Sequence, residues 1–456
     1  MVQPLTRDIG RFAAESRFDG LPRDVVSSVT LGFTDCCAVM LAGSKEPAVD
    51  QVRRLFAPGT NLPFGDAGLP ARTRAIIAGT AAHVLDYDDV ALDGHTSAVL
   101  VPALLALSRS HDVDGRDLVT AYAVGFEVWG ELIRRDRDHH HNKGWHPTTV
   151  FGTVAAAAAC ASLLRLPAEA AANAVAISAS LAGGLSANFG SMTKSFQVGR
   201  AAEAGVIAAE LAATGFTGAR DAIEHPRGFL TAISPAGQLD IDHPPALGRH
   251  WRLAATGLNI KQYPICYCAH RAVDAIVDLL ADQPLRPDDI ARIDVHLGRT
   301  ASNILRETLA TTALEAKFSL EFAMASAVVS GRVGLAELDD GFVRSAPVQD
   351  LMRRVSRHLV EDDEESDLPL ARADRVSITT AEGEKLHSRE VAHARGSPAQ
   401  PLEFEALWRK FEECAAPVTG DQCRALFDRL MRLDTAGRAP AIADLVFGLP
   451  ESVQYA

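Results

Sequence analysis

The sequence predicts a mainly helical protein with a smaller α+β domain inserted toward its C-terminal end. Up to Tyr263, apolar residues recur at helical spacing and no convincing strand is found. After Arg271, short alternating segments stand between helices, and helices alone then close the chain. We therefore expect a large all-helical domain over residues 1–271 and 396–456, and an α+β domain over residues 272–395.

The helices of the first domain are predicted from apolar spacing and from their end signals. Pro22 stands where a first-turn proline belongs, and the helix that follows it ends near Gly43. Several later helices are apolar almost all round, which is typical of helices packed between other helices. These further helices are expected at residues 75–83, 98–108, 118–134, 150–164, 168–181 and 201–213.

The inserted domain is predicted from segments that alternate between apolar and polar residues. Residues 292–297 read as a half-buried strand. Residues 375–381 and 385–391 read as a hairpin around the turn Glu382-Gly383. The remaining expectations are helices at 316–329 and 348–359, a solvated acidic loop at 361–365, and helices from 404 and 421 onward.

Composition excludes several classes of function. The chain has 456 residues, 47% of them apolar, with a formal net charge of -13. Such a balance disfavours binding to nucleic acid or to an anionic membrane, and the most apolar stretch, residues 154–164, is too short to span a bilayer. Seven cysteines, an odd number, and no secretory segment predict a reduced, cytoplasmic protein.

Four short segments place polar residues within apolar helical surroundings. Each carries a His or Lys beside Gly or Pro, at an expected helix boundary. Functional groups are often carried on loops that a rigid scaffold positions. The segments are residues 83–89 with 94–97, residues 144–149, residues 193–200 and residues 261–271.

These segments, in this order, resemble those of the MmgE/PrpD family. Its members include 2-methylcitrate dehydratases, cis-aconitate decarboxylases and iminodisuccinate epimerase. The resemblance covers nearly the whole chain and extends to Gly396-Ser397-Pro398 and Lys410-Phe411. It implies a large helical domain, a smaller α+β lid domain, a homodimer and a site at the domain junction. We expect catalysis without a cofactor or a metal.

The resemblance also implies site residues. Asp86 matches the aspartate that opens the family's acidic motif, and His95 matches the histidine that follows it. His146 matches the second site histidine. Lys194 and Lys261 match the two site lysines.

Two departures from the family's pattern weaken a decarboxylase interpretation. The decarboxylases have a threonine directly after the Asp-Asp pair, where this chain has Val90. They also have a site tyrosine in the helix near Phe318, where this chain offers only Leu320 and Phe322.

Proton transfer next to a carboxylate explains why such residues are needed. Removing that proton adds negative charge to an anion, so preformed cationic donors must face it, and Lys194, Lys261 and Arg200 are the candidates. The base needs a pKa near the working pH, which favours His95 or His146. The complete set is Asp86, His95, His146, Lys194 and Lys261 as catalytic residues, with Arg200, Gln197, Tyr263 and His270 as substrate-binding residues.

The leading hypothesis is a dehydratase or hydratase that acts on a small di- or tricarboxylate. An epimerase or isomerase is the alternative, and it would need two acid/base groups on opposite sides of one carbon. Decarboxylation comes third. A catalytically silent helical scaffold would predict no tight polycarboxylate binding.

Three other interpretations are disfavoured. The run Asp86-Tyr87-Asp88-Asp89 resembles the acidic motif of terpenoid cyclases, but only 6% of this chain is aromatic, and carbocations need aromatic walls. The tract His139-His140-His141 lacks the i, i+4 spacing of a helical metal pair. Cys266 and Cys268 lack both zinc-site spacing and a second pair.

Overall fold

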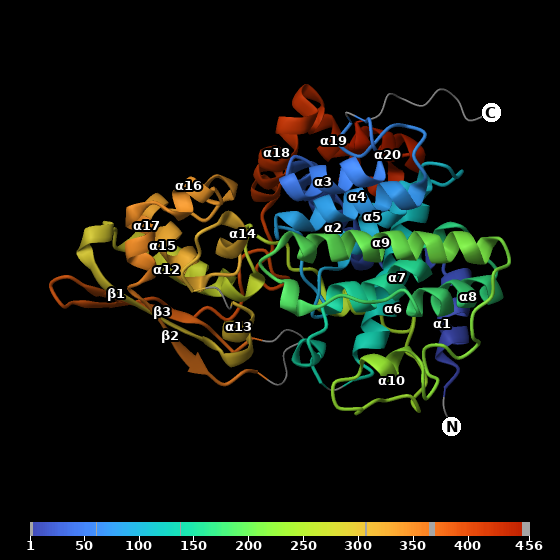
Figure 1. Cartoon of the computed structure of the whole chain (residues 1–456), viewed down its shortest axis with the longest axis horizontal. Helices are drawn as coiled ribbons and strands as arrows, with labels where there is room; N and C mark the ends of the chain where they lie inside the picture. Colours follow the sequence, from blue (N-terminus) through green and yellow to red (C-terminus); the bar gives the residue numbers. More distant parts are fainter. Residues whose placement is uncertain (1–2, 61, 137, 306–307, 364–369, 449–456) are drawn as a thin grey trace. The chain divides into compact units, whose positions relative to one another are not determined.

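The computed structural model describes residues 3–60, 62–136, 138–305, 308–363 and 370–448. The chain divides into two compact units (Figure 1). The first consists of residues 1–187, 193–258 and 404–456, and the second of residues 188–192 and 259–403.

The boundaries between the units differ from those expected at 271/272 and 395/396. The structure places them at 258/259 and 403/404. Backbone hydrogen bonds give the reason, because Ile260 N donates to Gly396 O at 2.8 Å and Cys266 N donates to Lys317 O at 2.8 Å. Residues 259–271 are thereby held within the second unit.

The first unit is helical, as predicted, and none of its described residues forms a named β-strand. Its helices are α1 (Leu5–Glu15), α2 (Arg23–Gly43), α3 (Pro47–Phe56), α4 (Ala71–Val84), α5 (Thr96–Ser108), α6 (Gly115–Ile133), α7 (Pro147–Leu163), α8 (Ala168–Ala179), α9 (Met192–Ala213), α10 (Phe229–Ile233), α11 (Arg252–Thr256), α18 (Phe404–Thr419), α19 (Cys423–Leu430) and α20 (Ala439–Phe447).

Helix α7 lies at the centre of the first unit, packed against α5, α6 and α8. The small side chains of residues 155–159 let these helices approach closely, and every residue of α7 except Ser162 is buried. Burying side chains such as Val150 and Phe151 contributes roughly 1.5–3 kcal/mol each. The N-terminus of α7, which carries His146, is therefore a rigid attachment point.

Helix α2 is long and apolar enough to cross a membrane when judged by length and composition alone. In the structure 72% of its most apolar window is buried, and it carries Asp35, which pairs with Lys410 at 2.6 Å. The core helix of a folded protein passes the same test, so this is weak evidence for a membrane span.

The second unit contains a four-stranded sheet in the order β2-β1-β3-β4. β1 (Ile290–Gly298), β3 (Arg375–Thr380) and β4 (Lys385–His387) confirm the predicted strand and hairpin. The expected helix at 348–359 was wrong in its second half, because α17 (Ala346–Met352) ends early and β2 (Val355–Val360) follows. β2 pairs in parallel with β1, a long-range contact that outweighs the local helical spacing.

The helices of the second unit lie beside this sheet (Figure 1). Ile293, Val295 and Leu297 of β1 are buried, whereas His296 between them is only half-buried. Of the expected acidic loop, residues 361–363 form no regular element, and residues 364–365 lie outside the described residues. The helices not yet named are α12 (His270–Asp282), α13 (Arg299–Ile304), α14 (Ala313–Ala316), α15 (Leu320–Ser330) and α16 (Asp340–Val343).

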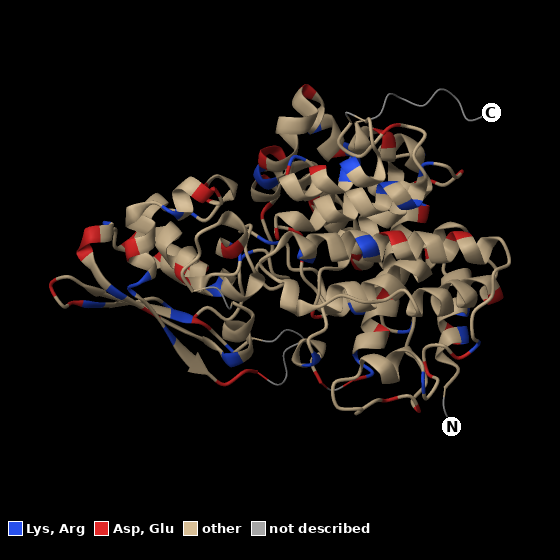
Figure 2. Ribbon diagram, viewed as in Figure 1, with Lys and Arg blue, Asp and Glu red and all other residues tan. Residues whose placement is uncertain are grey.

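Charged residues are interspersed along both units (Figure 2). The excess of acidic residues in the sequence is thus spread along the chain. All seven cysteines are buried, and none of them forms a disulfide in the structure.

Candidate active site

The turn that joins α4 to α5 carries the acidic motif. It begins with Asp86, a non-glycine residue at φ 52°, whose amide donates to His83 O at 3.1 Å. Leu92 and Asp93 also have positive φ, and Ala91 and Gly94 exchange two backbone hydrogen bonds of 2.9 Å. Each such residue costs about 1 kcal/mol or more, so the surrounding structure must hold this shape. The result is a compact turn whose polar side chains gather at the end of α4.

Asp88 bridges two histidines within the turn. His83 Nδ1 lies 2.9 Å from Asp88 Oδ2, and His95 Nδ1 lies 3.0 Å from the same oxygen. Burial opposes ionisation of Asp88, but the two imidazoles outweigh it and hold the pKa of this carboxyl well below its usual range. A carboxylate at Nδ1 fixes the tautomer that carries its proton there, which leaves Nε2 as the proton acceptor.

The two histidines differ in their access to solvent. The side chain of His83 is fully buried, whereas that of His95 is 15% exposed. Burial is the main reason that the pKa of His83 falls to about 4, so this residue is neutral at pH 7. His95 is therefore the one of the pair that can reach a substrate, and His83 supports Asp88 from behind.

Lys194 supplies the cation beside this cluster. It lies in the first turn of α9, and its Nζ pairs with Asp86 Oδ1. Both side chains are buried, at 7% and 4% exposed. A buried ammonium paired with one carboxylate is a preformed donor for an anionic substrate.

His146 precedes α7 and completes the cluster. Its ring centre lies 5.8 Å from that of His83, and the rings of His83 and His95 are 4.5 Å apart. Burial, followed by the charge of Lys194, holds the pKa of His146 well below its usual range. A neutral imidazole at this position serves as a hydrogen-bonding or proton-transfer group.

A second buried carboxyl lies behind Asp88. Asp89 Oδ1 accepts from Ser97 N at 3.2 Å, its other oxygen accepts from Ser97 Oγ, and that hydroxyl lies 2.7 Å from Tyr122 OH. Burial raises the pKa of Asp89 to about 7, and the hydrogen bond from Ser97 opposes the rise. This group changes its charge near neutral pH without any exposure to solvent.

The same residues contain the donor types of a metal site. One ligand atom each of His83, Asp88 and His95 lies within 4.8 Å of the others. The contact of His83 Nδ1 with Asp88 Oδ2 at 2.9 Å is a hydrogen bond, whereas that of His95 Nδ1 at 3.0 Å is an ion-pair contact that lacks hydrogen-bond geometry.

Two predicted substrate-binding residues are engaged elsewhere in the first unit. Arg200 pairs with Glu203 one turn along α9, and its side chain is 48% exposed. Arg200 follows Lys194 by six residues, so the two side chains point about 120° apart around the helix axis. The side-chain amide of Gln197 holds Leu185 through hydrogen bonds to its backbone N–H and C=O. Arg200 therefore points away from Lys194, whereas Gln197 lies beside residues 184–185, and Gly184 O accepts a hydrogen bond from His146 N at 3.0 Å.

Three predicted residues belong to the second unit, where all are buried: Lys261, Tyr263 and His270. Tyr263 OH donates to Asp274 Oδ1 at 2.6 Å, and His270 Nε2 lies 3.2 Å from Ile265 O. The rings of Tyr263 and His270 also pack at 5.1 Å. These contacts give Tyr263 and His270 a place in the core of the second unit.

Sequence reasoning assigned no role to His83 and Asp88, which the structure places at the centre of the cluster. The two residues were visible in the first polar segment, five positions apart across the end of a helix. Their spacing could have suggested a contact, but only the turn at Asp86 brings the imidazole and the carboxylate together.

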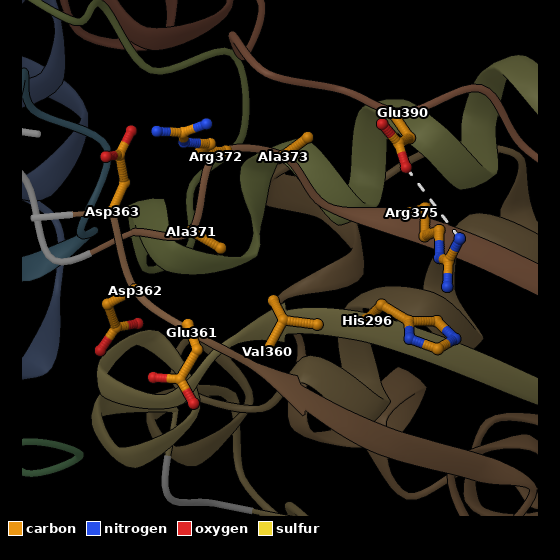
Figure 3. Close-up of a pocket in the computed structure, with 10 residues that line it drawn as sticks. All are labelled: His296, Val360, Glu361, Asp362, Asp363, Ala371, Arg372, Ala373, Arg375 and Glu390. Carbon is orange, nitrogen blue, oxygen red and sulfur yellow. Dashed lines mark ion pairs between the residues drawn. The ribbon is translucent and has the colours of Figure 1, made fainter.

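A separate open pocket of about 720 Å³ lies in the second unit (Figure 3). His296, Arg375 and Glu390 are among the residues that line it, and Arg375 pairs with Glu390 at 4.0 Å. Asp362 accepts hydrogen bonds from Thr300. Arg375 and Glu390 neutralise each other there, and the predicted site residues lie elsewhere.

Comparison with known proteins decides the family. The MmgE/PrpD N-terminal domain model matches residues 7–242, and the MmgE/PrpD C-terminal domain model matches residues 263–433. The chain belongs to the MmgE/PrpD family. The N-terminal match ends at residue 242 and the C-terminal match begins at residue 263, on either side of the boundary at 258/259, and the C-terminal match extends into the returning helices.

Relatives within the family are decarboxylases by name. The cis-aconitate decarboxylase of Homo sapiens is 27% identical over 364 residues, which cover 77% of this chain and 74% of that protein. A cis-aconitate decarboxylase-like protein of Aspergillus oryzae is 26% identical over 97% of both chains. The cis-aconitate decarboxylase of Aspergillus terreus is 26% identical over 98% of this chain and 93% of its own. These MmgE/PrpD relatives support the lyase class.

Proposed function

We propose that this protein is a cofactor-independent lyase that moves a proton at the carbon next to a carboxylate of a small di- or tricarboxylate. The observation that carries the proposal is the contact of Asp88 with both His83 and His95, beside the ion pair of Lys194 with Asp86. This arrangement supplies a base of defined tautomer and a cation within one cluster.

The chemistry follows from the charges. Lys194 attracts a substrate carboxylate and stabilises the extra negative charge that develops on it. His95 Nε2 exchanges a proton with the neighbouring carbon, while Asp88 stabilises the imidazolium through Nδ1. His146 is neutral and donates a hydrogen bond to the same anion. Asp86 keeps Lys194 in place until the substrate arrives.

Among lyase reactions, decarboxylation of cis-aconitate takes first place because the relatives carry that name. The bond from the chain carbon to one carboxylate breaks, carbon dioxide leaves, and the electron pair takes a proton from the His95 imidazolium, which water then protonates again. Dehydration is the second candidate. The observation in its favour is Val90, which is buried and apolar where the decarboxylases have threonine. A homodimer is proposed on the family resemblance alone, and a cytoplasmic location on the odd number of cysteines.

Product identity tests the assignment. The purified protein is incubated with cis-aconitate, citrate, 2-methylcitrate, malate and iminodisuccinate in turn, and products are followed by proton NMR beside a Lys194→Met control. Carbon dioxide and a five-carbon dicarboxylate from cis-aconitate support decarboxylation, and a new alkene from citrate or 2-methylcitrate supports dehydration. Inversion of one centre without either product would assign an epimerase instead. No change in any substrate would contradict the proposal.

A further inference from the structure

We propose that Lys410, contributed by the C-terminal helix α18, is a positioning residue for the turn that carries Asp86 and Asp88. The inference rests on the proposed function of that turn. It assigns a role in the site to a segment that returns to the first unit after the second unit is complete.

The contacts of Lys410 converge on the residue between the two aspartates. Lys410 Nζ donates to Tyr87 O at 2.9 Å and lies 4.1 Å from the centre of the Tyr87 ring. The same Nζ pairs with Asp35 Oδ1 of α2 at 2.6 Å. One ammonium group therefore joins α18 and α2 to the backbone of the turn.

All participants in this contact are buried. The side chains of Lys410 and Asp35 are 3% and 1% exposed, and Tyr87 is 4% exposed. A buried ammonium is costly unless its donors are satisfied, so the carbonyl of Tyr87 and the carboxylate of Asp35 fix its position. The reverse also holds, because a fixed ammonium restrains the peptide of Tyr87.

Restraint at Tyr87 acts on both of its neighbours. Asp86 on one side adopts φ 52° and holds Lys194, and Asp88 on the other side contacts His83 and His95. A shift of the Tyr87 peptide moves both carboxylates at once. Misplacement of catalytic groups by about 1 Å lowers rates by about 100-fold. A contact that fixes the Tyr87 peptide therefore affects the reaction rate without touching the substrate.

The experiment separates positioning from simple structural support. Lys410→Met removes the charge that pairs with buried Asp35, so it is expected to lower the melting temperature. The double variant Asp35→Asn/Lys410→Met removes both charges and is expected to recover most of that loss. Lys45→Met is the matched control, since exposed Lys45 also bonds α18, through Pro417 O at 2.7 Å.

Two readouts are taken on each protein. The first is turnover of the substrate found for the wild type, with kcat and KM separated. The second is the nitrogen-15 NMR spectrum of the His95 side chain without substrate, which reports the tautomer that Asp88 sets. The double variant is expected to keep kcat about 100-fold below the wild type, with KM little changed and a mixed His95 tautomer. Lys410→Arg is expected to keep part of the wild-type activity. The control Lys45→Met is expected to keep all of it.

Recovery of wild-type kcat and tautomer in a stable double variant would overturn the inference, because it would show that Lys410 only balances Asp35. The NMR readout does not depend on turnover. If the wild type turns over none of the substrates, the proposed function fails. The positioning role is then judged by the tautomer alone: a wild-type spectrum in the double variant overturns it, and a mixed one supports it.

Discussion

Asp88 is the residue on which the chemistry of the turn depends most. It is fully buried, and a single one of its oxygens contacts the Nδ1 atoms of both His83 and His95. An ionised carboxylate holds His83 in the tautomer with the proton on Nδ1 and favours the same tautomer in nearby His95, whose Nε2 can then exchange a proton. The geometry resembles the orientation of a catalytic histidine by an aspartate in hydrolases.

Replacing Asp88 by asparagine tests this role directly. The amide keeps the shape of the side chain but cannot accept from two imidazoles as a carboxylate does, so His95 is expected to populate the other tautomer. We expect kcat to fall by about 1,000-fold, within the range for the loss of an oriented general base. Steady-state kinetics and circular dichroism check the rate and the fold. A rate within threefold of the wild type in a folded variant would refute the role.

Asp89 predicts a pH dependence of stability. Its pKa rises from 3.8 to about 7 in the folded protein, so between these values the unfolded chain is ionised while the folded one keeps its proton. The folded state therefore loses stability as the pH rises through this window. His83 acts in the opposite sense, since its pKa falls from 6.5 to about 4 and stability is gained as the pH rises between those values.

Asp89→Asn isolates the first of these two effects. The amide resembles the protonated carboxyl and does not titrate. The melting temperature of the variant, relative to the wild type, is expected to increase steadily from pH 4 to pH 7. The reason is that ionisation of Asp89 stabilises the unfolded wild-type chain over this range, and the variant has no such group. Differential scanning calorimetry across this range measures it. A difference that does not vary with pH would show that Asp89 is ionised throughout.

Part of this cluster could be predicted from the sequence. Asp86, His95, His146 and Lys194 were selected by their motifs, and the structure places them together in the first unit. The role of Asp88 in the site was not predicted. It depends on one positive φ value at Asp86, which sequence periodicity does not reveal.

At the scale of elements, the close approach of α4 and α9 brings Lys194 to Asp86. Gly79 and Gly199 face each other there, since a Cβ on Gly79 would lie 2.9 Å from Gly199 Cα. A Cβ on Gly199 would lie 2.3 Å from the carbonyl oxygen of Ile76. Backbone atoms cannot yield as a side chain does, so the two glycines set the distance between the helices.

Gly199→Ala is expected to force α4 and α9 apart, and to lower the free energy of unfolding by about 1–3 kcal/mol. The pair of Lys194 with Asp86 should weaken, and turnover should fall with stability. Urea unfolding measures the first effect. Gly68→Ala is the control, because a Cβ there meets nothing within 4 Å. Equal stability of the two variants would contradict the close approach.

Elements were predicted well where local spacing decides them and poorly where pairing decides them. The helices expected at residues 75–83, 98–108, 118–134 and 150–164 correspond to α4, α5, α6 and α7, whereas α1 and α3 were not expected. β2 could not be predicted, because residues 348, 351, 352, 355 and 359 are apolar at helical spacing although the last two belong to a strand. Only the parallel partner β1 explains that strand.

At the scale of the whole molecule, the chain builds most of the first unit, then the second, and then returns. The returning segment, residues 404–456, packs α18 against α2 and α20 against α5. The two-part division could be predicted from the change in periodicity. The boundaries at 258/259 and 403/404 could not, because hydrogen bonds between residues far apart in sequence set them.

The central claim is that the cluster of the first unit exchanges a proton at a carbon next to a carboxylate. Mass spectrometry of cis-aconitate and its products after incubation in D2O measures this most directly, with Lys194→Met and His95→Gln beside the wild type. The account predicts deuterium on that carbon with the wild type, and a loss of about 100-fold or more in each variant. Turnover by the wild type without deuterium at that carbon, or full exchange in both variants, would contradict it.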